Sequence, residues 1–283
     1  MSESAQKREE EELPSCRPFL KWAGGKRQLL NEILKRVPAQ FNTYHEPFIG
    51  GGAVFFALQP EKAVLADLNS ELISCYESVR DELPALISWL EQYRYDEKEY
   101  YRIRGLDRTP EFHILPKYVR AARLIYLNRT CFNGLYRVNR SGFFNTPFGR
   151  YTNPTIVDRE NLTRCAEALQ GVTFVKDSFE SLLDRVVEGD FVYLDPPYPP
   201  LSASADFTSY TDQDFSWEDQ VRLKEVCDQL HARGALFLLS NAGIDSIREL
   251  YEGYSIDEVA AKRAINSKGG KRGAVHEFLI RNF

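Results

Sequence analysis

The chain has 283 residues, of which 43% are hydrophobic, and carries a formal net charge of −5. This length is sufficient for one large domain or two modest ones, and the apolar content supports a substantial core. No apolar run approaches the length of a membrane span, and the five scattered cysteines and four histidines have no metal-ligand spacing. We therefore expect a reducing compartment, no zinc site and no membrane contact.

The chain begins with charged and polar residues and lacks the apolar segment of a signal peptide. We predict a disordered tail over residues 1–16 and a cytoplasmic location. The run Phe19-Leu20-Lys21-Trp22-Ala23-Gly24-Gly25-Lys26 comes next, followed by a predicted helix over residues 28–37. A glycine pair before a helix lets backbone amides approach a ligand, and Trp22 offers a flat face. Taken alone the signal is weak, because the spacing is not that of a P-loop.

A glycine-rich turn follows a short strand predicted over residues 44–47. The turn is Phe48-Ile49-Gly50-Gly51-Gly52, and the next strand, residues 63–66, ends in Asp67, 17 residues after Gly50. An acid at the end of the second strand typically holds ribose hydroxyls, whereas the alternative is a generic βαβ crossover with a capping aspartate. The pairing of turn and acid favours a nucleoside-containing cofactor.

The middle of the chain is basic and interrupts the α/β pattern. Helices are predicted over residues 69–80, 83–90 and 117–128, and residues 112–157 contain seven Lys and Arg without one Asp or Glu. A polar, aromatic and basic run over residues 128–151 includes a predicted hairpin around residues 139–142. Such residues read base edges and contact phosphates, and segregated positive charge is typical of a polyanion-binding surface. The alternative is an accidental solvated face.

The α/β pattern then resumes. Helices are predicted over residues 161–169 and 217–233, and strands over residues 172–175, 191–194, 236–240, 254–259 and 275–280. The last two strands are expected to be antiparallel, joined by a flexible basic tip over residues 267–273. We therefore predict a catalytic domain made of residues 17–70 and 158–283, with an inserted recognition domain over residues 71–157.

The strand over residues 191–194 ends in Asp195-Pro196-Pro197-Tyr198. Ligands in open α/β sheets lie beyond the carboxyl ends of the strands, and the prolines restrict the backbone here. A ring beside a fixed carboxylate suits a planar substrate that bears an amino group. The alternative is a proline turn with a solvated aspartate.

Taken together, these motifs resemble those of the Dam-type DNA adenine-N6 methyltransferases. The segments that carry the resemblance are Lys21 to Lys26, Glu46 to Gly52, Leu65 to Asn69, Asn133 to Arg137, Pro147 to Tyr151, Asp195 to Tyr198 and the following run from Pro199 to Phe207. The resemblance covers about residues 17–283. Two features depart from the pattern of this family. Some relatives carry tyrosine at the position of Phe132, and the chain has an acidic amino-terminal extension that the resemblance does not explain.

The resemblance implies a Rossmann-like α/β sheet that binds S-adenosylmethionine, with an inserted, mainly helical DNA-recognition domain that carries a β-hairpin. It also implies methylation of a flipped adenine in double-stranded DNA, with GATC as the expected target. The product would be S-adenosylhomocysteine, with no metal, and we expect a monomer that is either associated with a bacterial nucleoid or encoded by a phage.

The candidate site residues follow from these motifs. The catalytic candidates are Asp195, Pro196, Pro197 and Tyr198, with Asp195 accepting hydrogen bonds from the adenine amino group and Tyr198 stacking on the base. The cofactor-binding candidates are Trp22, Lys26, Phe48, Gly50, Gly52, Asp67 and Asp195. The DNA-binding candidates are Lys21, Arg129, Phe132, Asn133, Leu135, Arg137, Asn139, Pro147, Arg150, Lys268 and Lys271.

Other functions stay open from the sequence. An RNA methyltransferase or a cytosine-N4 methyltransferase could share the cofactor fold and the strand-end motif. A catalytically inactive DNA-binding module would keep the basic insert without needing Asp195 and Tyr198. A nicotinamide oxidoreductase would share the glycine turn but would explain neither Asp195 to Tyr198 nor the basic insert. Mismatch repair, restriction protection, gene regulation and phage immunity all fit as biological roles.

Overall fold

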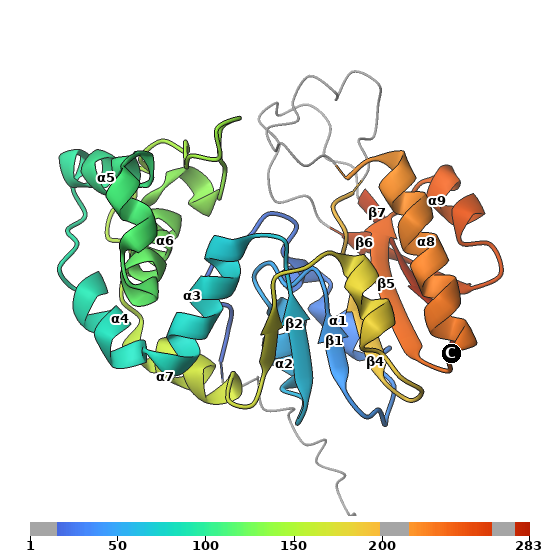
Figure 1. Cartoon of the computed structure of the whole chain (residues 1–283). Helices are drawn as coiled ribbons and strands as arrows, with labels where there is room; N and C mark the ends of the chain where they lie inside the picture. Colours follow the sequence, from blue (N-terminus) through green and yellow to red (C-terminus); the bar gives the residue numbers. More distant parts are fainter. Residues whose placement is uncertain (1–15, 199–214, 262–274) are drawn as a thin grey trace, which may run out of the picture.

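A seven-stranded sheet forms the centre of the molecule, in the order β3-β2-β1-β4-β5-β7-β6 (Figure 1). The computed structural model describes residues 16–198, 215–261 and 275–283. The strands are β1 Tyr44–Glu46, β2 Ala63–Ala66, β3 Thr173–Val175, β4 Phe191–Leu194, β5 Leu236–Ala242, β6 Ser255–Ala261 and β7 Val275–Arg281. The first five are parallel, whereas β7 pairs antiparallel with both β5 and β6. Both predicted closing strands are thus confirmed as antiparallel.

The sheet is covered on both faces, and β4 shows how the sequence achieves this. Phe191 and Tyr193 belong to one hydrophobic core, whereas Val192 and Leu194 belong to the other. Successive side chains of a strand point to opposite faces, so an unbroken apolar run is needed where both faces are buried. The strand consequently fixes the position of Asp195, the residue that follows it.

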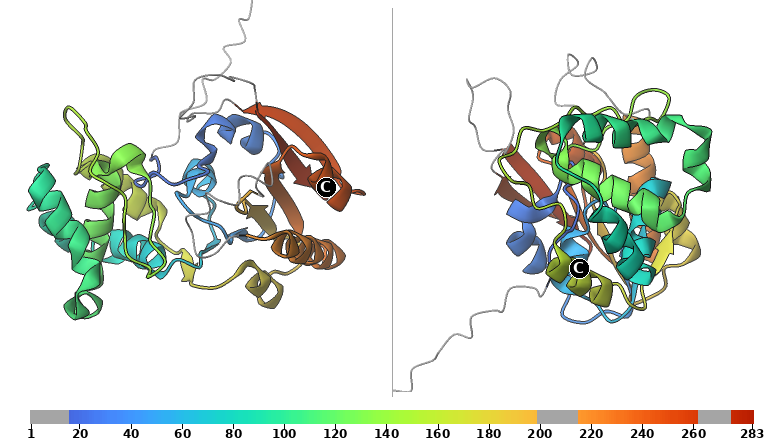
Figure 2. Two further views of the ribbon diagram at one scale, coloured as in Figure 1. Left: turned by 90° about the horizontal axis from the view of Figure 1, so that it is seen from above. Right: turned by 90° about the vertical axis from the view of Figure 1, so that its left-hand side faces the viewer.

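Nine α-helices surround the sheet within the described residues. They are α1 Leu30–Leu34, α2 Ala53–Leu58, α3 Ser70–Asp81, α4 Leu83–Leu90, α5 Glu97–Arg104, α6 Lys117–Thr130, α7 Arg159–Ala168, α8 Trp217–Ala232 and α9 Asp245–Leu250. Helices α8 and α9 pack with β4, β5 and β7 in one core, and α1, α2, α3 and α7 contribute to the other. Helices α4, α5 and α6 lie together beside the sheet (Figures 1 and 2).

Short 3₁₀ helices complete the chain, and several of them flank the pocket or the basic segment. They are η1 Lys26–Gln28, η2 Gly105–Arg108, η3 Pro110–Ile114, η4 Phe132–Gly134 and η5 Phe179–Asp184. Two caps set helix starts next to the pocket. The Asn69 side chain accepts from the backbone N–H groups of Glu71 and Leu72 and begins α3, and Ser216 with Asp219 forms a capping box that begins α8.

Three sequence predictions need correction. The helix expected over residues 28–37 is a 3₁₀ turn followed by a short α1, because the backbone bonds of Arg36 and Val37 are of the tighter i to i−3 kind. Cys16, placed in the disordered tail, is buried in the core with 4% exposure. Helix α5 was not foreseen, because its sequence is mostly polar and buries only Tyr100 and Ile103.

Some predictions lie outside the described residues. These are most of the expected tail, the run after Tyr198, and the basic tip with Lys268 and Lys271. The hairpin expected around residues 139–142 is confirmed, because Val138 and Phe144 form an antiparallel bridge and Asn139 N–H donates to the Phe143 carbonyl. The boundaries of the two predicted domains stay a prediction, because α3 and α6 of the predicted insert share one core with β1, β2 and α7 of the predicted catalytic domain.

Candidate active site

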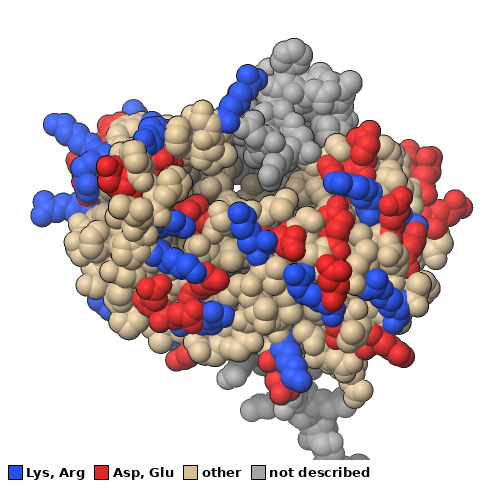
Figure 3. Space-filling view, viewed as in Figure 1, with Lys and Arg blue, Asp and Glu red and all other residues tan. Residues whose placement is uncertain are grey.

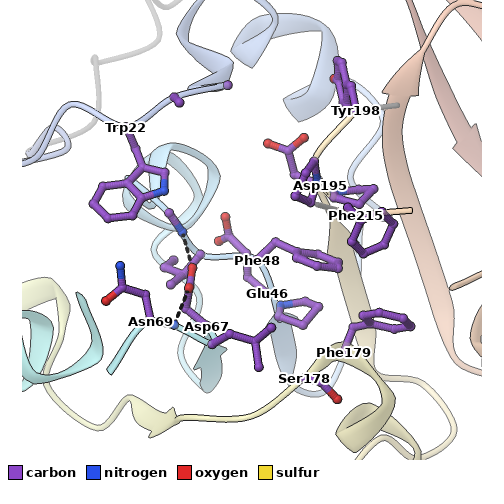
Figure 4. Close-up of a pocket in the computed structure, with 18 of the residues that line it drawn as sticks. Trp22, Glu46, Phe48, Asp67, Asn69, Ser178, Phe179, Asp195, Tyr198 and Phe215 are labelled. Carbon is purple, nitrogen blue, oxygen red and sulfur yellow. Dashed lines mark hydrogen bonds between the residues drawn. The ribbon is translucent and has the colours of Figure 1, made fainter. Parts of the chain in front are cut away.

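A large open cavity of about 1990 Å³ lies at the carboxyl ends of the parallel strands. Glu46 at the end of β1, Asp67 after β2 and Asp195 after β4 all line it, and Figure 4 shows their side chains around the same space. This is the edge at which parallel sheets bind ligands. The structure thus brings the Gly50 to Gly52 turn, Asp67 and the Asp195 to Tyr198 motif to one pocket.

The glycine turn and Asp67 form one unit. The Asp67 carboxylate accepts the Gly50 N–H at 3.3 Å and the Asn69 N–H at 2.9 Å, drawn as dashed lines in Figure 4. Gly50 and Gly52 have φ values of 45° and 68°, a left-handed conformation that favours glycine. Burial raises the pKa of the Asp67 carboxyl, although these two backbone bonds lower it. The carboxylate is thus fixed in place at the pocket wall.

Trp22 connects the glycine turn to the basic segment. A Cβ added to Gly50 would lie 2.8 Å from Trp22 Cδ1, so the indole packs directly on the turn. The same indole stacks on the ring of Tyr136, with 4.8 Å between the centroids and 20° between the planes. Both rings line the pocket. The pocket wall and the segment predicted to read DNA are therefore in direct contact.

The surroundings of Asp195 are charged and enclosed. Lys26 Nζ lies 2.8 Å from Asp195 Oδ1, and the Lys26 side chain is only 6% exposed. Burial raises the pKa of the Asp195 carboxyl to about 6, although the Lys26 ammonium lowers it. The ammonium also lies 4.5 Å from the centre of the Tyr198 ring. Lys26 therefore contacts Asp195 and Tyr198, the side chains proposed to be catalytic. From the sequence alone, Lys26 was predicted to bind the cofactor.

A second buried acid lies close to Asp195. Glu46 is 3% exposed and accepts a hydrogen bond of 2.8 Å from the Tyr44 hydroxyl. Burial raises the pKa of the Glu46 carboxyl to about 8, although the Tyr44 hydroxyl lowers it. At neutral pH this side chain is mostly protonated, so it can donate as well as accept in the pocket. Glu46 opens the Glu46 to Gly52 motif, but the sequence did not predict it as a site residue.

The rings of Phe48, Phe179 and Phe215 form one wall of the pocket. Of these three residues, only Phe48 was predicted from the sequence. The centroid of the Phe48 ring lies 5.7 Å from that of Phe179 and 5.9 Å from that of Phe215, and the last two are 5.8 Å apart. Phe179 begins η5 and Phe215 precedes α8, so chain regions far from the glycine turn supply them. No local pattern in the sequence singles them out.

Most residues predicted to contact DNA are either exposed at the surface or take part in hydrogen bonds within the hairpin. Those with exposed side chains are Lys21, Phe132, Asn133, Leu135, Pro147 and Arg150. Asn139 is half-buried and shapes the hairpin turn by accepting from the Ser141 and Phe143 N–H groups. Arg137 Nε donates to Asn145 Oδ1 at 2.6 Å, which holds the guanidinium across the base of the hairpin.

Arg129 lies differently from the other DNA-binding candidates. Its guanidinium donates to the Phe19 carbonyl at 2.9 Å, and burial lowers its pKa. This placement favours a structural role that joins α6 to the segment before Trp22. Lys268 and Lys271 lie outside the described residues, so their predicted phosphate contacts stay predictions.

Three of the seven cations in residues 112–157 pair with acids from elsewhere in the chain. Lys117 pairs with Glu77, Arg120 with Glu71, and Arg123 with Asp107, at 2.6, 2.9 and 2.8 Å. Figure 3 shows Lys and Arg interspersed with Asp and Glu over the side of the molecule seen in Figure 1. The expectation of a segregated basic surface is therefore wrong for the part of the segment in α6.

Comparison with known proteins decides the family. Residues 22–265 match the D12 class N6 adenine-specific DNA methyltransferases. The chain belongs to this family. It is 45% identical over 273 residues to the type II methyltransferase M1.LlaDCHI of Lactococcus lactis subsp. cremoris, with 95% of this chain and 96% of the relative covered.

Two further relatives come from an archaeon and a bacterium. Identity is 42% over 287 residues to the type II methyltransferase M.MjaIII of Methanocaldococcus jannaschii, with coverage of 94% and 99%. It is 38% over 267 residues to the DNA adenine methylase of Escherichia coli K12, with coverage of 93% and 94%. The chain is thus an enzyme that methylates adenine N6 in DNA, and its family uses S-adenosylmethionine.

The pocket of this methyltransferase fits that cofactor. A fixed carboxylate, Asp67, suits a ribose diol, and the three phenylalanine rings suit an adenine face. Across the described part of the chain, no group of three His, Cys, Asp or Glu could hold a metal ion. The same residues include no helix that is long and apolar enough to cross a bilayer.

Proposed function

We propose that this DNA adenine-N6 methyltransferase acts as a monomer on a flipped adenine within GATC, with Asp195 as the acceptor for the target amino group. The observation that carries this proposal is the partly buried Asp195 carboxylate, 18% exposed, which lines the same pocket as Asp67 and the glycine turn. A flipped base is required because the target nitrogen is inaccessible for this chemistry inside the duplex.

The cofactor supplies a methyl group carried on a positively charged sulfur. In this proposal Asp67 binds the ribose hydroxyls, Phe48, Phe179 and Phe215 enclose the adenine of the cofactor, and Trp22 with the glycine turn closes the remaining side. These assignments are supported by the shared cavity that the residues line. Fixing two reactants in one pocket supplies a large part of the rate, because it removes the entropy cost of their encounter.

Asp195 has to make a poor nucleophile react. The lone pair of adenine N6 is delocalised into the ring, and a carboxylate that accepts its N–H favours the pyramidal geometry of attack. The N–C bond forms while the S–C bond breaks with its electron pair left on sulfur. The positive charge then lies on N6 until that nitrogen loses a proton. Asp195 is ionised above about pH 6 and can stabilise this charge.

The GATC assignment rests on the recognition segment. Residues 133–137 and 147–151 resemble the base-reading segment of Dam-type enzymes. Asn133, Leu135 and Pro147 in these segments are exposed, and Tyr136 lines the pocket and stacks on Trp22. Arg137 is the candidate for guanine, because a guanidinium can bond to guanine O6 and N7 together.

Substitution of Asp195 tests the catalytic assignment. Asp195→Ala is expected to slow methyl transfer by about 10²–10⁴, the range for loss of a polar catalytic group, while duplex binding is retained. Asp184→Ala, which removes an exposed carboxylate at the end of η5, is the matched control and should turn over normally. Near-normal single-turnover rates in Asp195→Ala would refute the assignment.

A pool of duplexes with random sequence tests the target. After methylation with labelled cofactor, the modified positions are read by sequencing, and adenines within GATC are expected to be labelled first. Equal labelling of adenine in other four-base contexts would contradict GATC, and labelling of cytosine would contradict adenine as the target base. Sedimentation of the enzyme with one duplex tests whether a single copy suffices.

A further inference from the structure

Glu277 on β7 is an acid that the reaction outlined above does not use. β7 runs between β5 and β6, where Glu277 pairs with Ala242 on one side and Val259 on the other. Its side chain is only 14% exposed. The two-residue alternation of a strand places Glu277 on the same face as Leu279, whose core also contains Tyr193 of β4. Glu277 therefore reaches the active site from the antiparallel end of the sheet.

Two contacts connect Glu277 to the catalytic candidates. The Tyr198 hydroxyl donates to Glu277 Oε2 at 2.5 Å, and Lys26 Nζ lies 3.8 Å from the same oxygen. Lys26 in turn lies 2.8 Å from Asp195 and faces the Tyr198 ring at 4.5 Å. The four side chains thus form a closed network that joins η1, the end of β4 and β7.

The ring of Tyr198 needs such an anchor. The Pro196-Pro197 pair fixes the backbone before Tyr198 but leaves the ring free to turn about its own side-chain torsions. The hydroxyl bond to Glu277 supplies a second fixed point at the opposite end of the ring. A ring held at both ends presents a defined face to a planar base, whereas a rotating ring does not.

Charge gives Glu277 a second effect. Lys26 places a positive charge beside the atoms where positive charge develops on the target nitrogen, which opposes the reaction. With Asp195 and Glu277 ionised, the three groups carry a net charge of −1, whereas Lys26 and Asp195 alone would sum to zero. A net negative charge beside the target nitrogen stabilises the positive charge that develops on it.

We propose that Glu277 is a positioning residue for adenine methylation, which fixes the Tyr198 ring through its hydroxyl and offsets the charge of Lys26 beside Asp195. The proposal rests on the proposed roles of Asp195 and Tyr198. It assigns a function to a residue some 250 positions from Lys26 in the sequence.

The pH dependence of kcat/KM separates this role from a purely structural one. The groups that act on Asp195 are Lys26, Glu277, Glu46 and the tyrosines Tyr44, Tyr193 and Tyr198. The charge of Glu277 raises the pKa of Asp195, and that of Lys26 lowers it. Glu277→Gln should therefore move the acidic limb of the profile to lower pH, and Lys26→Met should move it to higher pH.

The rate is expected to fall in Glu277→Gln despite that shift. Single-turnover methylation at pH 8 should slow about ten- to a hundredfold, the range for weakening a hydrogen bond to a charged group. Glu258→Gln on the neighbouring β6 is the matched control, because it removes the same charge from an exposed carboxylate. It should leave both the rate and the acidic limb unchanged.

A double-mutant cycle tests the Tyr198 contact. Tyr198→Phe keeps the ring and removes the hydroxyl, so it should reduce the fluorescence of 2-aminopurine placed at the target position, and so should Glu277→Gln. The two changes together should have little more effect than one. Additive losses would show that Glu277 does not act through the hydroxyl and would refute that part of the proposal.

Two outcomes distinguish this inference from the function on which it rests. Normal rates and an unmoved acidic limb in Glu277→Gln, with Asp195→Ala inactive, would overturn the role of Glu277 and leave the catalytic assignment intact. Normal turnover in Asp195→Ala would overturn the catalytic assignment itself. Circular dichroism and thermal unfolding of Glu277→Gln must match the parent enzyme, and Tyr198→Phe provides an independent test if they do not.

Discussion

The pocket at the sheet edge and the basic segment around the hairpin use charge in opposite ways. At the pocket Lys26 contacts both Asp195 and Glu277, Glu46 lies near Asp195, and burial raises the pKa of Glu46 and Asp195. In the basic segment most cations of α6 are paired with acids, and the residues left at the surface, such as Arg150, are exposed.

The difference indicates what each region contributes. Buried charges with perturbed pKa values act through protonation state and geometry, so changes there should appear in rates and pH profiles. Exposed cations act through long-range attraction and base contacts, so changes there should appear in salt dependence and sequence preference. The Trp22–Tyr136 stack is one contact at which the two regions meet.

The largest expected effect concerns the ion pair between Asp107 and Arg123 of α6, which is shielded from solvent as the charges of the pocket are. Asp107 contacts Arg123 at 2.8 Å and accepts the Phe144 N–H at 2.7 Å, and both charged side chains are nearly buried. Asp107→Ala would leave the Arg123 charge without its partner, so we expect a loss of about 3–5 kcal/mol in the free energy of unfolding.

Chemical denaturation measures this loss. The matched control is Glu160→Ala, which breaks the exposed pair with Arg164 on α7 and should cost less than about 1 kcal/mol. Equal losses in the two variants would show that burial does not distinguish them, and the comparison between buried and exposed charges would then fail.

The next effect belongs to the pocket. Asp67→Ala removes the carboxylate proposed to bind the ribose, and a lost hydrogen bond to a charged group is worth about 1.5–3 kcal/mol, or roughly ten- to a hundredfold in cofactor affinity. Calorimetry with S-adenosylhomocysteine should show this loss, while duplex affinity without cofactor is unchanged. An unaltered cofactor affinity would mean that Asp67 serves only the glycine turn.

A somewhat smaller effect is expected for base reading. Arg137→Ala should relax preference at a guanine of the site by about 1–3 kcal/mol, the discrimination of one bidentate contact. Methylation rates on every single-base variant of GATC measure it. A uniform slowing across all variants would mean that Arg137, through its bond to Asn145, holds the hairpin instead of reading a base.

The smallest effect is expected at the exposed rim. Arg150→Ala should weaken all duplexes alike and reduce the log–log salt slope of binding by about 0.9, the value for one phosphate contact. Binding titrations at several salt concentrations, with specific and nonspecific duplexes in parallel, give the slope. A loss confined to the specific duplex would move Arg150 from phosphate contact to base reading.

The sequence predicted the strands and the strand-end acids well, because these features are local. Asp67 and Asp195 directly follow apolar runs, and the ends of β2 and β4 were predicted at the observed residues. Periodicity also gave most helices to within two or three residues. Where it failed, as in α5, too few apolar side chains face the core for the pattern to show.

The remaining site residues could not be predicted because distant elements supply them. Phe179, Phe215 and Glu277 come from η5, the residue before the α8 cap, and β7, and only the assembled fold brings them to the pocket around Asp195. The same reason explains the misjudged basic surface. A charge count along the chain cannot show that Glu71 and Glu77 of α3 lie against Lys117 and Arg120 of α6.

The position of β7 between β5 and β6 also bears on how the enzyme is made. A ribosome completes β5 and β6 before β7, so until β7 is made the two strands lack the strand that lies between them. Until β7 enters, the edge of β5 stays open to other chains and Glu277 cannot reach Tyr198 or Lys26. The contacts of Glu277 with Tyr198 and Lys26 can therefore form only after β7, and hence the whole DNA-reading segment, has been synthesised.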